Sequence, residues 1–219
     1  MEYTLNESEV RVLGALVEKA ETTPEYYPLT LNALVNACNQ KSNRDPVVCY
    51  DDQTVVRALE SLREKGLVRA ITGDRVPKYR HYFDEAYQLS PAEMAVLCEL
   101  MLRGPQTFGE LRGRIERFGQ ELTIAEVESL LENLEVREDG PLVVRLPRQP
   151  GRKEARYMHL IAGKPDLTEF AVEARVEPAT QGGRAENARI ARLEEEVTQL
   201  REALAVLQQQ FDDFRRQFE

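Results

Sequence analysis

The sequence is poor in the residue types that build metal centres and many active sites. It has three cysteines, Cys38, Cys49 and Cys98, which form no CxxC pair, and two histidines, His81 and His159. An odd number of unpaired cysteines is typical of free thiols in a reducing cytoplasm, and so few ligands argue against a structural zinc site. We therefore expect a cytoplasmic protein with neither a metal nor another cofactor.

Motifs for catalysis and for membrane insertion are also missing. The sequence has no glycine-rich phosphate loop and no nucleophile with a nearby base motif, and we interpret its two histidines as structural. No apolar run approaches the ~20 residues needed to span a bilayer, and the N-terminus lacks the basic and apolar regions of a secretion signal. These absences predict a protein that is not an enzyme and does not act at a membrane.

Acidic residues outnumber basic ones, which gives the chain a formal net charge of −9 at pH 7. The excess is uneven. Residues 1–88 carry 11 basic and 14 acidic side chains, residues 89–165 carry 11 and 12, and residues 166–219 carry 7 and 12. The overall sign disfavours bulk attraction to nucleic acid. The acidity is nevertheless concentrated in the last segment, so the charge balance of the first two is nearly even.

The segment from Asp51 to Phe83 organises the rest of the sequence. Its first part has apolar residues at three- and four-residue spacing, namely Val55, Val56, Leu59 and Leu62. This spacing predicts a helix capped by Asp51 or Asp52 and stopped by Gly66. Two strands are expected over residues 67–71 and 79–83, on either side of a turn. A helix, a glycine stop and a two-stranded ribbon form the second half of a winged helix-turn-helix.

Two further helices are expected before this segment. Asn6 and Glu9 have the spacing of a capping box for the first helix, and Thr30 precedes the second. Residues 39–50 then form a connection longer than the turn of a minimal helix-turn-helix. The region up to residue 88 therefore has every element of a winged helix.

The same pattern repeats in the following residues. The apolar and acidic positions Leu5, Glu9, Val12, Leu13 and Leu16 recur 84 positions later as Leu89, Glu93, Val96, Leu97 and Leu100. Ser90, Thr107 and Thr123 precede the expected helices, and strands are expected over residues 142–146 and 156–160. Internal repetition of this kind indicates duplicated structural units.

We therefore predict a mainly α-helical fold with small β wings. It consists of two tandem winged helix-turn-helix domains, residues 1–88 and 89–165, followed by a linker over residues 166–186 and a coiled-coil-like helix over residues 187–219. The C-terminal helix is indicated by an apolar heptad seam, formed by Ile190, Leu193, Val197, Leu200, Leu204, Leu207, Phe211, Phe214 and Phe218. Such a seam predicts a homo-oligomer. Its bulky phenylalanines leave open a trimer, an antiparallel pair or docking onto the winged domains.

The sequence also resembles the YceH-like family of bacterial proteins. The resemblance rests on LNESEVRVLGALVEKAETTPEYYPLTLNALVNACNQKSNRDPVV, on DQTVVRALESLREKGLV and on VEPATQGGRAEN. It covers nearly the whole chain, and the NACNQKSNRDPV stretch is its most specific part. The resemblance implies a pair of winged-helix domains in a family whose molecular function is largely uncharacterised.

In winged helices that bind DNA, the second helix of the motif enters the major groove and the wing contacts the backbone. The Asp51 helix would present Gln53, Thr54 and Arg57 to the bases. The wings would present cations to the phosphates, namely Arg75, Lys78, Arg80, Arg148, Arg152 and Lys153. Against this hypothesis, Asp51 and Asp52 would repel phosphate, and the matching helix of the second repeat carries glutamates and no base.

The connection over residues 39–50 offers a further candidate site. Its polar side chains Lys41, Asn43 and Arg44 are candidates for contact with a ligand or partner. The alternative is an ordinary turn whose side chains bond to their own backbone.

These observations leave two possible functions from different classes. One is a regulator that binds double-stranded DNA and self-associates through its C-terminal helix. The other is a protein–protein scaffold of the acidic tandem winged-helix type, as in the chromosome-segregation protein ScpB, without direct DNA contact. Nucleic-acid binding is the commonest use of the fold, which places the DNA-binding hypothesis first by analogy.

Overall fold

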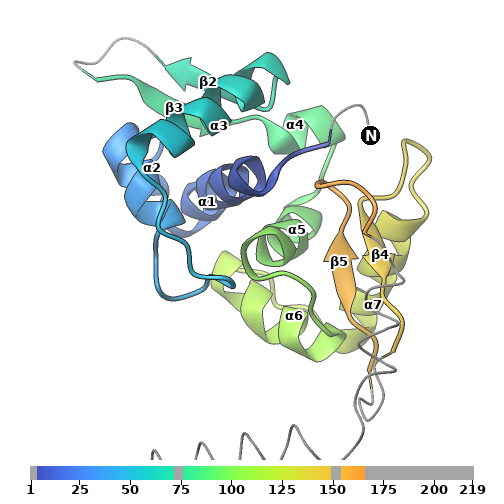
Figure 1. Cartoon of the computed structure of the whole chain (residues 1–219). Helices are drawn as coiled ribbons and strands as arrows, with labels where there is room; N and C mark the ends of the chain where they lie inside the picture. Colours follow the sequence, from blue (N-terminus) through green and yellow to red (C-terminus); the bar gives the residue numbers. More distant parts are fainter. Residues whose placement is uncertain (1–3, 72–75, 149–153, 166–219) are drawn as a thin grey trace, which may run out of the picture. The chain divides into compact units, whose positions relative to one another are not determined.

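The computed structural model describes residues 4–71, 76–148 and 154–165 (Figure 1). This part of the chain is mainly helical with small antiparallel sheets, an arrangement compatible with a winged-helix-like fold. The expected linker and heptad helix lie outside the described residues, as do three of the candidate wing cations, Arg75, Arg152 and Lys153.

The first half follows the expected order, with a 3-10 helix and a short strand added. Its elements are α1 (Glu7–Thr22), η1 (Pro24–Tyr26), β1 (Leu29–Thr30), α2 (Leu31–Cys38), α3 (Asp52–Glu64), β2 (Val68–Ile71) and β3 (Lys78–His81). The strands form an antiparallel sheet in the order β1-β3-β2, with Leu29 opposite Tyr79 and Val68 opposite His81. The sequence does not reveal β1, because two residues carry no alternating pattern and the strand exists only by pairing with β3.

The second half repeats this order. Its elements are α5 (Pro91–Arg103), α6 (Phe108–Ile115), η2 (Glu116–Phe118), α7 (Ile124–Glu135), β4 (Val143–Arg145) and β5 (Tyr157–His159). β4 and β5 are antiparallel, with Val143 opposite His159. A single bridge joins Gln106 to Tyr157, at the position that corresponds to the pairing of β1 with β3. The two halves therefore share one plan of helices and paired strands.

The predicted helix starts are confirmed. Complete capping boxes begin four of the helices described. They are formed by Asn6 and Glu9 in α1, Ser90 and Glu93 in α5, Thr107 and Glu110 in α6, and Thr123 and Glu126 in α7. Asp51 is the cap of α3, and its carboxylate accepts a hydrogen bond of 2.8 Å from the backbone N–H of Thr54. Gly66, just after α3, has a φ of 72°, the left-handed conformation that glycine adopts at little cost.

The end of the first half differs from the prediction. The expected strand over residues 79–83 stops at His81, and Phe83 begins a short helix, α4 (Phe83–Tyr87). The side chain of Phe83 is fully buried and its ring lies 5.1 Å from that of Tyr87, four residues on. One helical turn brings these two rings to the same side. The expectation of a strand that continues to residue 83 is therefore wrong.

The two halves pack together through α1 and α5, which lie side by side (Figure 1). Every residue from Glu9 to Glu18 in α1 is buried, and so is every residue from Met94 to Leu102 in α5. A helix that is buried all round is expected inside a core rather than on a surface. A Cβ atom on Gly14 would lie 3.0 Å from Leu102 Cδ2, so glycine permits the close approach of the two helices.

Four charged side chains connect the halves beside this helix pair. Glu18 of α1 binds Arg44 of the loop after α2, with Oε2 to Nη2 at 2.5 Å and Oε1 to Nη1 at 3.0 Å. Arg117 of η2 binds Glu18 Oε1 at 2.6 Å and Glu99 Oε1 of α5 at 2.7 Å. The side chains of Glu18, Arg44 and Glu99 are at most 1% exposed. Arg117 thus bridges one buried carboxylate from each half, and we call Glu18, Arg44, Glu99 and Arg117 the inter-half ion network.

The two carboxylates of this network have different electrostatic balances. Burial acts to raise the pKa of Glu18, but the hydrogen bonds and charge of Arg44, with the charge of Arg117, outweigh it and lower that pKa. Burial also raises the pKa of Glu99, and there Arg117 opposes the effect only in part. Glu18 is therefore the carboxylate whose ionised form the network stabilises most.

We predict that Arg44→Met destabilises the protein by about 3–5 kcal/mol, because it leaves the buried Glu18 carboxylate with an incomplete set of partners. Lys41→Met in the same loop is the control, since Lys41 is exposed and its loss should change stability by no more than about 0.5 kcal/mol. Urea denaturation of both variants measures the difference. Equal midpoints for the two variants would show that the network contributes little to stability.

Candidate nucleic-acid interface

The exposed face of α3 carries the residues predicted to reach DNA bases. Val55, Leu59 and Leu62 hold the opposite face of the helix in the core. Gln53 and Arg57 are exposed, and Arg57 forms no hydrogen bond or ion pair with another described residue. These two side chains are therefore available to hydrogen-bond a ligand outside the protein.

Thr54, the third predicted base contact, is already engaged at the start of the helix. Hydrogen bonds from its side chain and its backbone lower the pKa of the Asp51 carboxyl. Asp51 is thus the helix cap and carries a charge that would face any approaching phosphate. Thr54 is half-buried and bonded to Asp51, so it is less free than Gln53 and Arg57 to contact a ligand.

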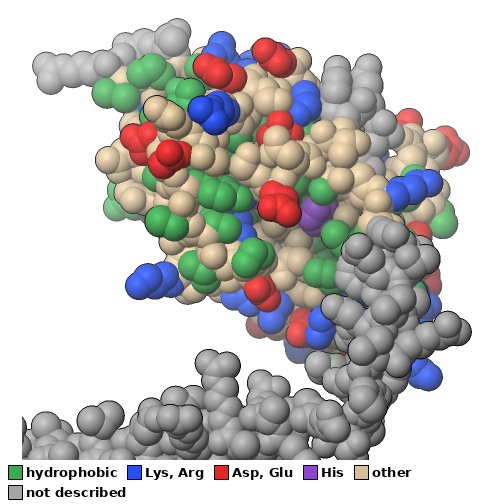
Figure 2. All heavy atoms as spheres, in the orientation of Figure 1, with side chains coloured by type: hydrophobic (Ala, Val, Ile, Leu, Met, Phe, Trp, Pro, Cys, Tyr) green, Lys and Arg blue, Asp and Glu red, His purple; other side chains and the backbone are tan. Residues whose placement is uncertain are grey.

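Acidic side chains also lie on this helix. The exposed residues farther along α3 are Glu60, Arg63 and Glu64. Figure 2 shows the same mixture more widely, with basic and acidic side chains interspersed over the visible face of the described residues. Together with Asp51, Asp52 and Arg57, these residues give the exposed face of α3 more carboxylates than guanidinium groups, so it is not a strongly basic surface.

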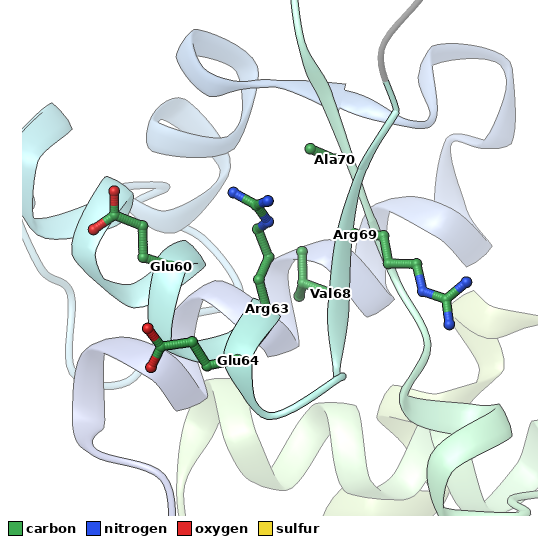
Figure 3. A pocket seen from close by; sticks show the side chains of 6 residues that line it. All are labelled: Glu60, Arg63, Glu64, Val68, Arg69 and Ala70. Carbon is green, nitrogen blue, oxygen red and sulfur yellow. The ribbon is translucent and has the colours of Figure 1, made fainter.

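An open groove of about 660 Å³ lies beside α3 (Figure 3). Its lining residues come from the C-terminal part of the helix and from β2, and they are Glu60, Arg63, Glu64, Val68, Arg69 and Ala70. Figure 3 shows the side chains of Glu60 and Glu64 on the helix, with Arg63 between the helix and the strand. Two carboxylates and the guanidinium group of Arg63 therefore lie beside one hollow, which Arg69 borders with its side chain pointing away from the helix (Figure 3).

The strands of the first half carry two of the predicted phosphate contacts. Arg80 is exposed and lies 3.8 Å from Glu85, while Lys78 is half-buried. The sequence analysis missed Arg69, which stands directly opposite Arg80 on β2. The alternation of inward and outward residues along residues 67–71 could have pointed to it.

The second half presents a different surface at the equivalent helix. Glu128 and Glu132 of α7 are exposed, and no basic residue lies within the helix. Arg148 is exposed after β4, whereas the rest of the predicted basic tip lies outside the described residues. Arg117 adds nothing to a basic surface there, because its guanidinium belongs to the inter-half ion network.

The loop over residues 39–50 has a structural role at two of its three candidate residues. Arg44 is fully buried, contrary to the expectation that it contacts a ligand, because its guanidinium binds Glu18 and also donates to the carbonyl oxygen of Ala37 at 2.7 Å. Asn43 accepts a hydrogen bond from Arg103 of α5. Lys41 alone among the three is exposed.

The two histidines occupy equivalent places, each on the last strand of its half and each facing a valine on the neighbouring strand. Both are buried, and burial lowers the pKa of each to about 4, although the charge of Asp84 opposes this for His81. Burial likewise raises the pKa of Cys38 to about 12. Among the residues that the structure describes, no group of His, Cys, Asp and Glu side chains is arranged to hold a metal ion. None of the helices described is long and apolar enough to cross a membrane.

We predict that the free energy of unfolding falls as the pH is lowered from 6.5 to 4. In this range His159 binds a proton in the unfolded chain, where its pKa is about 6.5, but not in the folded chain, where its pKa is about 4. A difference of this size lowers the free energy of unfolding by about 3 kcal/mol between the two ends of the range. The variant His159→Phe should flatten the dependence, as measured by urea denaturation at several pH values. An unchanged slope in the variant would contradict this assignment.

Comparison with known proteins places the chain in a family. Residues 5–152 match the family described as "Protein of unknown function, DUF480". The chain is 54% identical over 220 residues to a UPF0502 protein of Geobacter sulfurreducens and 56% identical over 220 residues to one of Geotalea uraniireducens, and each alignment covers 100% of both proteins. A UPF0502 protein of Solibacter usitatus is 51% identical over the same full length. The match to most of the chain and these full-length alignments show that it belongs to the DUF480, or UPF0502, family of bacterial proteins.

Proposed function

We propose that this protein is a DNA-binding regulator built from two tandem winged-helix domains, residues 1–88 and 89–165, in which the first domain contacts DNA. The observation that carries the proposal is the exposed face of α3, where Gln53 and Arg57 project from a helix anchored by its opposite side. Amide and guanidinium groups are the side chains best suited to hydrogen-bond base edges. The resemblance to YceH-like proteins supports the paired winged helices.

The exposed surfaces of the two halves indicate which half contacts the DNA bases. The exposed face of α3 carries Gln53, Arg57 and Arg63 beside its acidic residues, whereas α7 carries Glu128 and Glu132 and no basic residue. A row of carboxylates would repel the phosphates that line a DNA groove. We therefore assign the contact with bases to the first half alone.

Self-association through the C-terminal helix completes the proposal. The heptad seam from Ile190 to Phe218 is long enough to bury an apolar stripe against a second copy. A second copy would double the number of DNA-contacting helices, and dimeric winged helices commonly read paired half-sites. The free thiols fit function in a reducing cytoplasm.

The alternative is a protein–protein scaffold that does not bind DNA. The outer face of α7 favours it, because the apolar side chains of Ile124 and Val136 are 54% and 76% exposed at either end of an acidic helix. Exposed apolar residues at the edges of a charged surface are a common feature of protein interfaces. The two functions differ in whether the purified protein binds duplex DNA.

We predict that the purified protein binds mixed genomic DNA fragments with an affinity that falls as salt rises. Arg57→Ala should weaken this binding by about 1–3 kcal/mol at constant salt if Arg57 contacts a base. Arg112→Ala is the control, because Arg112 is also exposed but is paired with Glu116 on the second half. Fluorescence anisotropy measures all three proteins. Absence of binding even at low salt would remove the DNA-binding proposal and leave the scaffold.

We also predict that Leu200→Asp combined with Leu207→Asp converts the oligomer to a monomer. Both leucines occupy the same heptad position in the seam, where a carboxylate would have to be buried against the partner helix. Light scattering coupled to gel filtration measures the mass. A wild-type protein that is already monomeric would contradict the proposed self-association.

A further inference from the structure

The outer face of the first sheet is a second surface with unusual charge. Side chains alternate along a strand, so Val68 and His81 face the core while Arg69 and Arg80 face outward. Arg69 and Arg80 stand directly opposite each other in the antiparallel pair, and the next outward pair is Ile71 with Lys78. Three of these four outward positions carry a positive charge.

This arrangement has an electrostatic cost within the protein. Like charges directly opposite on a sheet repel, and Arg69 forms no ion pair with another described residue. Glu85 lies 3.8 Å from Arg80, but both side chains are well exposed, so water and salt weaken the pair. Acidic residues outnumber basic ones in this chain, whose net charge is −9, so a cluster of cations on one face is not expected from its composition alone.

Tyr82 fixes the positions of both guanidinium groups. The Cζ atom of Arg69 lies 4.5 Å from the centre of the Tyr82 ring, and that of Arg80 lies 5.1 Å from it. Stacking of this kind attracts a cation to the ring and restricts the freedom of its side chain. The two arginines are therefore held beside each other before any ligand binds.

This surface adjoins the groove beside α3, because Arg69 also lines that groove. In Figure 3 the side chain of Arg69 points away from α3, whereas Arg63 lies between the helix and β2. A ligand on the outer face would therefore contact the arginines of the sheet and not the hydrogen-bonding residues of α3. The two surfaces can act on different parts of one extended ligand.

We propose that Arg69 and Arg80, held by Tyr82, form a phosphate clamp that grips the backbone of the bound DNA duplex. This inference rests on the proposed function. A guanidinium group presents two parallel N–H donors to phosphate oxygens, and a phosphate between the two arginines would neutralise their repulsion. The clamp carries no sequence information, so it adds affinity for any duplex while α3 provides base contacts.

The test measures DNA affinity across a salt series for the full-length protein and for Arg69→Gln/Arg80→Gln. Each lost phosphate contact lowers the slope of log affinity against log salt by about 0.9, so the double variant should lower it by about 1.8. Binding at 0.1 M salt should weaken by about tenfold for each contact, equally for unrelated sequences. Both side chains are exposed, so the variant should remain folded, which circular dichroism checks.

Two further variants separate the clamp from a general effect of charge. Arg112→Gln/Lys164→Gln removes the same number of charges from exposed positions elsewhere and should leave the slope unchanged. Arg69→Lys/Arg80→Lys should restore most of the slope, because slope reports charge neutralisation, but not the full affinity of a bidentate pair. A slope in Arg69→Gln/Arg80→Gln equal to that of the wild type would overturn the clamp and leave DNA binding through α3 intact. Failure of the wild type to bind any duplex would overturn both proposals.

Discussion

The arrangement of this protein depends on the need to neutralise two buried carboxylates at the contact between its halves. Glu18 belongs to the first half and Glu99 to the second, and Arg117 binds both. An ionised carboxylate removed from water without a partner is strongly destabilising. If the first half folded alone, Glu18 would lose Arg117, the partner that the second half supplies. The inter-half ion network and the close packing of α1 against α5 therefore join the two repeats in one core, and the repeats are not independently folded units.

The same contact reaches the helix that we propose binds DNA. The loop over residues 39–50 leads directly into α3, and Arg44 attaches that loop to Glu18. Asn39 and Tyr50 close the loop at its ends, since each bonds to the other at 2.7 Å and 2.8 Å. Asp45 also donates its backbone N–H to Leu102 of α5 at 3.0 Å. The position of α3 is thus set by contacts with the second half as well as by its own packing, which gives the specific polar sequence of the loop a structural reason.

The sequence predicted what depends on neighbouring residues and missed what depends on distant ones. Capping boxes and apolar spacing act within a few residues, and they located the starts of α1, α3, α5 and α7 correctly. β1 is a strand only because it pairs with β3, so no pattern in the neighbouring sequence predicts it. Arg44 stands among polar residues that read as a solvated turn, and only the fold shows that its guanidinium is enclosed. Arg69 was not predicted for a similar reason: it is the register of the two strands that places it opposite Arg80.

Duplication of a fold does not duplicate the chemistry of its surfaces. The buried faces of α3 and α7 are alike, each with a valine and leucines in the core, because both must pack against the same kind of neighbours. Their exposed faces are not constrained in this way: that of α3 mixes an amide, arginines and carboxylates, whereas that of α7 carries glutamates and no basic residue. A net charge of −9 averages over such differences and describes none of them. An acidic protein can therefore present a cationic sheet face in one half and an acidic helix in the other, and its binding partners are determined by these separate surfaces rather than by its overall charge.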